Sequence, residues 1–271
     1  DARPKGGGLN EYGIAAYKTV NEFASKELNW LLSIGGIELK TGLRLGDNLA
    51  LDTLQDSHDA VVLAMGLSGV NAMGCPGEDA GHVQDAVDFI ARVRQDDHCD
   101  IPVGRNVVVV GGGMTAIDAA VQAKFLGAET VTIAYRRSRG AMGASPFEQN
   151  LATSKGVTIR EHLQPMDISA DNIALGFTRQ GEGGLELTGE TAVLHADQVL
   201  VAVGQSLNLP VALTMDGRKI AVDEGGHTSL TGVWAAGDCT NGEDLTVVAV
   251  AEGRDVAENI HSTLSAAKAE G

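Results

Sequence analysis

A glycine-rich turn in the middle of the chain constrains the fold more than any other feature of the sequence. The stretch VVVVGGGMTAIDAA, residues 107–120, places Gly111, Gly113 and Ala116 in a G-x-G-x-x-A pattern directly after an apolar strand. The first glycine permits a tight turn, the second lets the backbone approach a pyrophosphate, and the alanine allows close packing of helix on strand. The phosphate would lie on the N–H groups of the helix N-terminus, which favour anions. We therefore expect a dinucleotide-binding turn, with a purely structural turn as the alternative.

Two arginines bear on which dinucleotide this turn would bind. The next predicted strand is followed by Arg136 and Arg137, about 20 residues beyond the turn. A site that selects a free ribose hydroxyl has an acidic residue at this place, whereas arginine fits a 2′-phosphate. The arginines therefore favour NADP over NAD. Two other interpretations stay open: they hold the adenine or pyrophosphate of NAD, or they form with Arg139 a solvated basic corner on an acidic protein.

Strand–helix–strand units recur along the chain. Buried strands are predicted at residues 107–110, 130–135, 157–161 and 199–203, with helices at 114–126 and 148–154 and a small antiparallel sheet within 173–194. Outside this block the pattern predicts strands at 37–41, 60–65 and 233–236 and helices at 19–34, 83–94 and 245–266. The last helix has an alanine-rich face that we expect to pack on a sheet. Units of this kind form parallel sheets, so the fold class is α/β, with two Rossmann-like three-layer nucleotide-binding domains.

The order of these units predicts that one domain is inserted into the other. The polar segment 95–105, which contains Pro102, is the expected boundary. We predict that residues 101–204 form the inserted domain, and that residues 1–100 and 205–271 form the outer one. The opening stretch DARPKGGG reaches a glycine cluster without a preceding strand and glycine turn, so we expect the outer domain to be incomplete at its N-terminus.

A second strand, glycine turn and acidic residue follow near the end of the sequence. The stretch WAAGDCTNGEDL places Gly237 and Asp238 directly after a buried strand and before a long helix. A carboxylate at such a place can accept hydrogen bonds from a ribityl chain, and the N-terminus of the following helix can face the pyrimidine ring of a flavin. An ordinary helix-capping acid is the alternative.

Composition excludes several classes of protein. The net charge of −16 argues against a nucleic-acid or anionic-membrane binder. No apolar run approaches the ~18 residues of a membrane span, and the polar opening stretch is no signal peptide. Cys75, Cys99 and Cys239 lie too far apart for a CxxC pair or a metal cluster, which argues against a thioredoxin-reductase-like enzyme. We predict no metal site and a cytoplasmic, reducing compartment.

Five motifs in order resemble one family across the whole chain. They are GGLNEYGIAAYK, LAMGLSGVNAMGCPGED, VVVVGGGMTAIDAA, YRRSRGAMGAS and WAAGDCTNGEDLTVVAVAEGR. The family comprises flavin- and pyridine-nucleotide-binding reductases typified by the glutamate synthase small subunit and the N-terminal half of dihydropyrimidine dehydrogenase. The sequences of the first motif and of the stretch ASPFEQNLATSKGVTIR most resemble those of the bacterial dihydropyrimidine dehydrogenase flavin subunit.

The resemblance implies a role for each of a set of residues. Toward FAD it implies Asp1 at the adenosine ribose, Gly7, Gly8 and Leu9 beside the phosphates, Lys18 near the flavin, Gly237 and Asp238 at the ribityl chain, and Asp244, Leu245 and Thr246 against the isoalloxazine ring. Toward NADP or NAD it implies Gly111, Gly112, Gly113, Met114 and Thr115 at the pyrophosphate, Arg136 and Arg137 at the adenosine phosphate, and Ala202, Val203 and Gly204 near the nicotinamide. No catalytic acid–base residue is expected, because the cofactors carry the chemistry.

The function implied is that of an FAD-dependent NAD(P)H oxidoreductase, or diaphorase, subunit. Hydride would pass from the nicotinamide to FAD, and electrons would pass on to an iron–sulfur or flavin-bearing catalytic partner that reduces uracil or thymine. An iron–sulfur cluster is expected only in that partner or in a missing N-terminal segment. The alternatives are a glutamate synthase small subunit, which donates electrons from NADPH, and a non-catalytic NAD(P)-binding fragment. The oligomeric state is not predicted.

Overall fold

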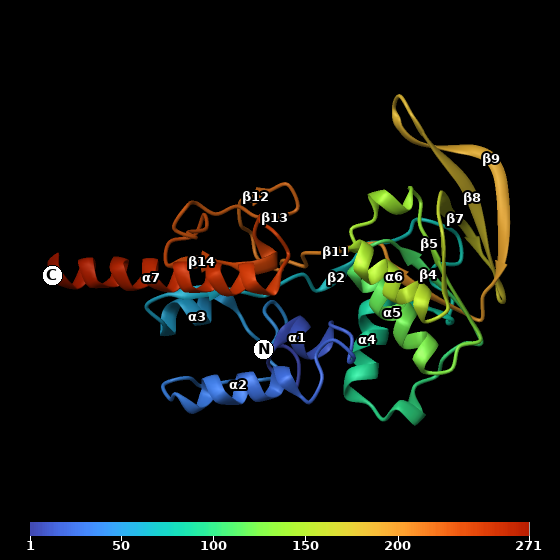
Figure 1. Ribbon diagram of the computed structural model, residues 1–271. Coiled ribbons are helices and arrows are strands. Elements are labelled where there is room, and N and C mark those ends of the chain that lie inside the picture. The colour runs from blue at the N-terminus through green and yellow to red at the C-terminus, as the bar shows by residue number, and fades with distance from the viewer. Residues whose placement is uncertain (271) are drawn as a thin grey trace. The chain divides into compact units, whose positions relative to one another are not determined.

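The computed structural model describes residues 1–270 and divides them into two compact units (Figure 1). Unit 1 contains Asp1–Gly6, Leu32–Gly69 and the chain from Gln205 onward, and unit 2 contains Gly7–Leu31 and Val70–Gly204. Unit 2 therefore includes all of residues 101–204, the predicted insertion. It also takes in residues 7–31 and 70–100, which the sequence pattern assigned to the outer domain.

A five-stranded parallel sheet forms the centre of unit 2. Its strands run in the order β3-β10-β4-β5-β6. Their bounds are β3 (Val83–Asp85), β4 (Asn106–Gly111), β5 (Thr130–Ala134), β6 (Val157–Arg160) and β10 (Gln198–Ala202). The chain leaves β4 in one direction toward β5 and β6, while β10 returns on its other side. This reversal of strand order is the place where sheets of this class bind ligands.

The four valines of β4 show how the sequence builds three layers. Successive side chains of a strand point to opposite faces. Val107 and Val109 enter a core shared with α4 (Ala86–Gln95) and α5 (Met114–Phe125), whereas Val108 and Val110 enter a second core on the other face. That face is covered by an antiparallel sheet of β7 (Leu163–Ile168), β8 (Asn172–Gly181) and β9 (Gly184–His195). Figure 1 shows α5 and β7–β9 on opposite sides of the parallel strands.

Small residues and capping signals set the helices of unit 2. Helix α5 packs closely on the sheet because four of its alanines are fully buried. Helix α6 (Pro146–Ser154) begins at a capping box in which the Ser145 side chain accepts from the N–H of Glu148 and the Glu148 carboxylate accepts from Ser145. Pro146 suits the first helical position because its missing N–H would have no acceptor there. The shorter elements are α1 (Gly8–Tyr12), η1 (His98–Asp100) and η2 (Arg139–Ala141), and α2 (Phe23–Ser33) follows α1.

Unit 1 is built on a parallel pair, β1 (Val61–Leu63) and β14 (Val233–Ala235). Around it lie α3 (Leu51–Ser57), the hairpin of β12 (Met215–Asp216) and β13 (Lys219–Ile220), η3 (Gly237–Cys239) and α7 (Thr246–Glu270). The core joins apolar side chains from the β1–β14 pair, α3, β13 and η3: Leu51, Val61, Leu63, Ile220, Val233, Ala235 and Cys239. The short strands β2 (Gly69–Val70) and β11 (Gln205–Ser206) form a separate pair.

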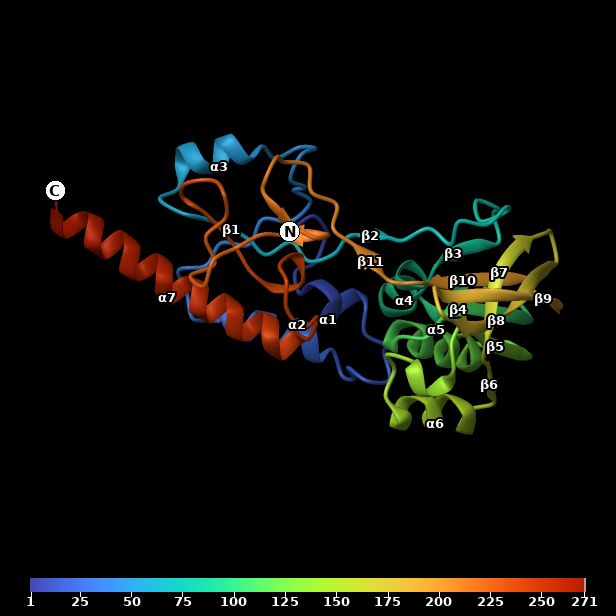
Figure 2. The same ribbon diagram turned by 90° about the horizontal axis from the view of Figure 1, so that it is seen from above.

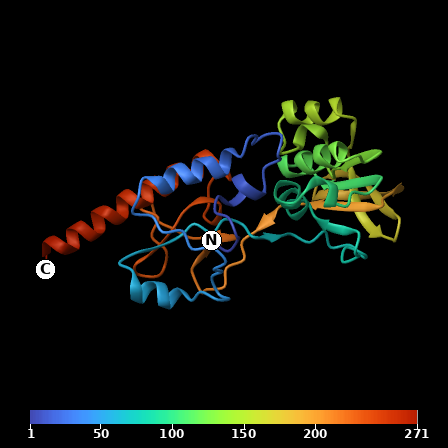
Figure 3. The ribbon, with the colours of Figure 1, turned by 90° about the horizontal axis from the view of Figure 1, so that it is seen from below.

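Three secondary-structure predictions are wrong. Residues 37–41 form no strand, and their side chains are exposed. Residues 83–94 are not helical throughout, because Val83–Asp85 pairs with β10 before α4 begins. Helix α7 is not packed along an alanine-rich face: of its residues with described burial, Val256 alone is buried, against Trp234 and Ala236. Figures 2 and 3 show its later turns extending away from the core of unit 1.

The helices in the described part of the chain are all too short or too polar to span a membrane.

Candidate dinucleotide-binding site

The three glycines of the β4–α5 turn differ in what surrounds them. At Gly111, φ is +149° and an added Cβ would lie 2.2 Å from the Ala202 carbonyl oxygen. At Gly112 an added Cβ would lie 2.5 Å from the ring of Tyr135. At Gly113 an added Cβ would meet no atom within 4 Å. The first two glycines therefore allow the chain to pack closely, and the third keeps the backbone open to an approaching group, as a pyrophosphate needs.

Helix α5 has an accessible N-terminus at this turn. The N–H groups of Ala116 and Ile117 donate to the Gly113 carbonyl at 3.1 and 3.3 Å. The N–H groups of Met114 and Thr115 belong to the first turn, which an α-helix leaves without acceptors of its own. Met114 is 45% exposed, so this end of the helix is accessible. The residues present thus fit a phosphate group, in both hydrogen bonding and helix dipole.

The loop before α6 lies along the same turn. The Ala144 N–H donates to the Gly112 carbonyl at 3.0 Å, and a Cβ on Gly143 would lie 3.9 Å from the Gly113 Cα. The Tyr135 hydroxyl donates to the Ala141 carbonyl at 2.7 Å. The loop and the glycine turn are therefore held together by backbone contacts, and the Tyr135 side chain adds one hydrogen bond to the loop.

Arg136 and Arg137 follow β5, beside the glycine turn, and both side chains are exposed. Their backbone is fixed, because the Thr178 hydroxyl donates to the Arg136 carbonyl at 2.6 Å and the His162 N–H donates to that of Arg137 at 3.2 Å. In the described part of the chain neither guanidinium has an ion-pair partner. Arg139 differs, because its guanidinium donates to Gln149 at 2.8 Å and to Asn150 at 3.1 Å. Arg136 and Arg137 are thus the arginines available to an anion.

The end of β10 completes this edge of the sheet. Ala202 pairs with Gly111 in the parallel ladder, and the next residues, Val203 and Gly204, leave the strand. Gly204 has φ +103° and its carbonyl accepts from the N–H of Asn71 at 3.0 Å. A cavity of about 210 Å³ lies beside this edge, lined in part by Asp85 and Val201. The structure therefore brings the glycine turn, the two arginines and the β10 end to one edge of the sheet.

Among the predicted flavin contacts, Gly237 and Asp238 form a partly buried turn in unit 1. Gly237 has φ +76°, and its N–H donates to the Glu252 carboxylate of α7 at 2.7 Å. Burial, and then the charge of Asp244, raises the pKa of Asp238. Asp244 forms an ion pair with Lys219. Leu245 and Thr246, at the start of α7, are exposed.

Four further predicted flavin contacts are divided between unit 1 and unit 2. Asp1 is in unit 1, outside any strand, and its carboxylate accepts from the Arg3 N–H at 2.8 Å. Gly7, Gly8 and Leu9 are in unit 2 at the start of α1, where Gly7 has φ +116° and Gly8 φ +54°. All four residues are exposed, and their contact with FAD stays a prediction.

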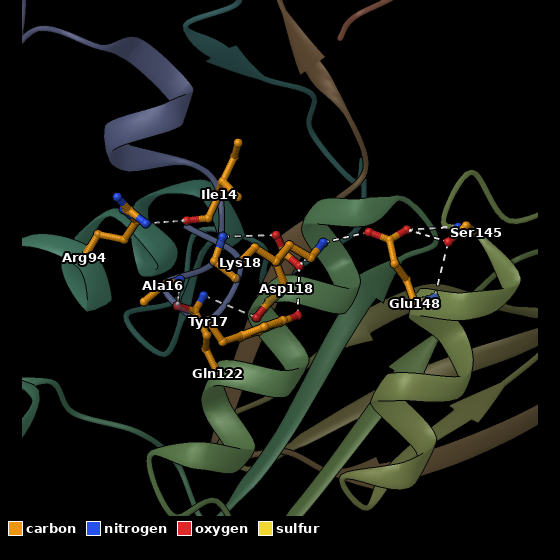
Figure 4. Close-up of polar contacts among 10 residues, drawn as sticks. Ile14, Ala16, Tyr17, Lys18, Arg94, Asp118, Gln122, Ser145 and Glu148 are labelled. Atoms are coloured by element: carbon orange, nitrogen blue, oxygen red, sulfur yellow. Dashed lines mark hydrogen bonds and ion pairs between the residues drawn. The ribbon is translucent and has the colours of Figure 1, made fainter. Parts of the chain in front are cut away.

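Lys18, predicted near a flavin, is held by two carboxylates of unit 2 (Figure 4). Its ammonium lies 2.6 Å from Asp118 Oδ1 and 2.6 Å from Glu148 Oε1. Burial alone would lower the pKa of Lys18, but the hydrogen bonds and charges of the two carboxylates outweigh burial, and the pKa is raised. Burial likewise opposes ionisation of Glu148, yet Lys18 and Ser145 lower its pKa.

Asp118 is a buried acid that the sequence interpretation missed. Its carboxylate accepts from the Ala15 N–H at 3.1 Å and from the Tyr17 hydroxyl at 3.0 Å, in addition to the ion pair with Lys18. Burial, followed by the charge of Asp118, raises the pKa of Tyr17, which keeps the phenol protonated as the donor. The one available signal was an acidic residue within an alanine-rich helix; its partners lie about a hundred positions away.

The cysteines do not form a redox pair. All three are free, with Cys75 and Cys239 buried and Cys99 exposed. The Cys239 thiol donates to backbone carbonyls, including that of Leu63 at 3.2 Å, and burial raises its pKa. A protonated, buried thiol is a poor nucleophile.

Solved structures with the same fold are named as oxidoreductases, one of them in complex with NADPH. FprA of Mycobacterium tuberculosis in complex with NADPH aligns over 99% of this chain and 77% of its own, with a TM-score of 0.79 and 19% identity. Thioredoxin reductase of T. acidophilum aligns over 97% of this chain and 88% of its own, with a TM-score of 0.71 and 17% identity. These likenesses confirm the predicted fold class of Rossmann-like nucleotide-binding domains.

The sequence establishes the family. Residues 6–253 match the family model described as pyridine nucleotide-disulphide oxidoreductase, and the chain therefore belongs to this family, whose members use FAD and NAD(P). The NAD-dependent dihydropyrimidine dehydrogenase subunit PreT of Salmonella typhimurium is 30% identical over 98% of this chain and 62% of that protein. The glutamate synthase [NADPH] small chain of Escherichia coli is 32% identical over 97% of this chain and 62% of that protein. The predicted resemblance to these two groups is confirmed, and the chain spans about three fifths of the length of either relative.

Proposed function

We propose that this chain is the nucleotide- and flavin-binding part of an oxidoreductase subunit that takes electrons from NADPH. The observation that carries the proposal is the edge of the parallel sheet where Gly113 is open, the α5 N-terminus is accessible, and Arg136 and Arg137 have no ion-pair partner among the described residues. A dinucleotide pyrophosphate fits the turn, and a 2′-phosphate fits the arginines.

The nicotinamide would lie toward the β10 end, where Ala202 approaches Gly111 and a cavity of about 210 Å³ opens. Gly237, Asp238 and the start of α7 would hold the flavin through the Asp238 carboxylate and the N–H groups of the first turn of α7. FAD supplies the chemistry of accepting a hydride and releasing electrons singly. The residues of this chain bind and orient the two cofactors, and none is needed as an acid or base.

We propose further that the electrons go to an iron–sulfur or flavin-bearing partner subunit that reduces a pyrimidine. The support is the similarity to PreT, which is named as a subunit of a dihydropyrimidine dehydrogenase. A second candidate is the role of a glutamate synthase small chain, supported by a similarity of the same extent. Purification of the protein with its natural partner separates the two, because one partner carries a pyrimidine-reducing site and the other a glutaminase domain.

The proposed hydride transfer is tested by a visible absorption spectrum of the chain after incubation with FAD and desalting. We expect retained flavin bands that bleach anaerobically on addition of NADPH, and more slowly on addition of NADH. A protein that binds NADPH but retains no flavin would be a nucleotide-binding part only. A protein whose bound flavin is not bleached by either nucleotide would contradict the proposed transfer.

A further inference from the structure

The ion pairs of Lys18 join two helices that border the nucleotide turn. Asp118 is the fifth residue of α5, about 6 Å along the helix axis from Met114 at the helix N-terminus. Glu148 lies in the first turn of α6, which follows the loop that is hydrogen-bonded to Gly112. Both carboxylates are largely buried, with side chains 5% and 13% exposed. Figure 4 shows Lys18 between them.

Two carboxylates in this position work against an incoming pyrophosphate. Like charges at such distances repel, and partial burial reduces the screening by water and salt. With all three side chains ionised their formal net charge is −1, and without Lys18 the formal charge of the two carboxylates is −2. The α5 N-terminus supplies only about half a positive charge. The charge of Lys18 therefore decides whether the local charge repels a phosphate strongly or weakly.

We infer that Lys18 is a charge-balancing residue of the dinucleotide site: its ammonium offsets Asp118 and Glu148 and so weakens the repulsion that a pyrophosphate meets at the α5 N-terminus. This inference rests on the proposed nucleotide site. It gives Lys18 a role toward the nucleotide, whereas the family resemblance placed this residue near the flavin.

A purely mechanical role for Lys18 explains the arrangement less well. The segment that carries Lys18 is already held against the rest of unit 2 by other hydrogen bonds. The Ala15 and Ala16 N–H groups donate to Asp118 and Gln122 at 3.1 and 3.2 Å, and the Tyr17 hydroxyl donates to Asp118 at 3.0 Å. Arg94 donates to backbone carbonyls of the same segment, including that of Ile14 at 3.3 Å. Because the segment is already held in place, what the Lys18 ammonium contributes is a positive charge between two buried carboxylates.

A series of variants that changes only the charge tests the inference. Lys18→Met gives the three positions a net charge of −2, Glu148→Gln gives 0, and the double variant restores −1. Glutamine suits position 148 because it can still complete the capping box. The dissociation constant of NADPH is measured for each protein by isothermal titration at low salt and at 1 M salt, with the thermal melting curve as a check on folding.

We expect Lys18→Met to weaken NADPH binding about tenfold at low salt, and Glu148→Gln to bind as tightly as the wild type or tighter. The double variant and Lys18→Arg should lie close to the wild type, and 1 M salt should shrink the differences. Weaker binding by Glu148→Gln, to the same extent as by Lys18→Met, would show a mechanical role and overturn the inference. So would unchanged binding by Lys18→Met. A folded wild-type protein that binds neither NADPH nor NADH would instead overturn the proposed function, and this inference with it.

Discussion

The carbonyl oxygen of Ala202 lies 2.2 Å from the position that a Cβ on Gly111 would occupy. The contact joins the ends of β10 and β4 at the place where the sheet reverses its strand order. Backbone atoms form it, so no side-chain movement can relieve a clash there. The β4–α5 turn thus depends on a glycine that lets two strands end side by side.

Gly111→Ala should therefore make the protein less stable. The left-handed φ of +149° and the backbone clash together should cost about 2–5 kcal/mol in the free energy of unfolding. Urea denaturation followed by circular dichroism measures this. Gly113→Ala is the matched control, because its φ is −89° and its added Cβ meets no atom within 4 Å. It should cost at most about 1 kcal/mol, the loss of a glycine N-cap. Equal costs at both positions would contradict the turn geometry.

Arg136→Gln combined with Arg137→Gln should change cofactor preference rather than binding in general. A charge-assisted hydrogen bond contributes about 1.5–3 kcal/mol, so the dissociation constant of NADPH should rise about ten- to a hundredfold while that of NADH changes little. Arg179→Gln, an exposed arginine on β8, is the control and should affect neither nucleotide. Equal losses for NADPH and NADH would show that the arginines hold a group that both nucleotides share.

The ion pair of Glu148 should make stability depend on acid pH. Lys18 and Ser145 hold the pKa of Glu148 below its usual 4.5, so the folded state releases this proton more readily than the unfolded state. The stabilisation is therefore complete above about pH 4.5 and is lost as the pH falls through the lowered pKa. Glu148→Gln should be less stable than the wild type by about 1–2 kcal/mol at pH 7, and this difference should vanish in acid.

Urea denaturation of both proteins between pH 3 and pH 8 measures the difference. Glu182→Gln, at an exposed position in the β8–β9 turn, is the control and should match the wild type throughout. A constant difference between wild type and Glu148→Gln across this pH range would show that the carboxylate charge plays no part.

Asp238 should reduce the stability of the protein at neutral pH. Burial, and then the charge of Asp244, raises its pKa above the usual 3.8, so the folded state resists its ionisation. Asp238→Asn should therefore raise the melting temperature at pH 7, and the gain should disappear below about pH 3.8. The same variant should bind FAD more weakly if this carboxylate holds the ribityl chain. Asp59→Asn, at an exposed position, should change neither property. A lower melting temperature for Asp238→Asn at pH 7 would mean that the carboxylate serves as a structural cap.

The strand, turn and helix of residues 106–125 were predictable because each is encoded locally. Valines alternate between two cores, glycines permit the turn, and alanines let the helix approach the sheet. Residues 37–41 show the limit, since a strand was predicted there, but in the described part of the chain they pair with no strand and their side chains are exposed. Val83–Asp85 shows the opposite case, in which pairing with β10 overrides a helical pattern.

The candidate site likewise has features that the sequence predicts and features that only the folded chain shows. The spacing of Arg136 from the glycine turn follows from one strand–helix–strand unit and could be predicted. The environment of Lys18 could not, because Asp118 and Glu148 lie 100 and 130 positions away in the sequence and only the folded chain brings them together. Glu252 was missed for the same reason, since its hydrogen bond to Gly237 depends on how α7 lies in unit 1.

The central claim is that the β4–α5 turn binds NADPH, and calorimetric titration of the wild-type chain and Gly113→Ala tests it most directly. We predict one saturable site in the wild type, tighter for NADPH than for NADH. In Gly113→Ala, whose added methyl group occupies the approach to the helix N-terminus, we predict a loss of at least about tenfold with the fold intact. No saturable binding by the folded wild-type chain, or equal binding by the variant, would contradict the account.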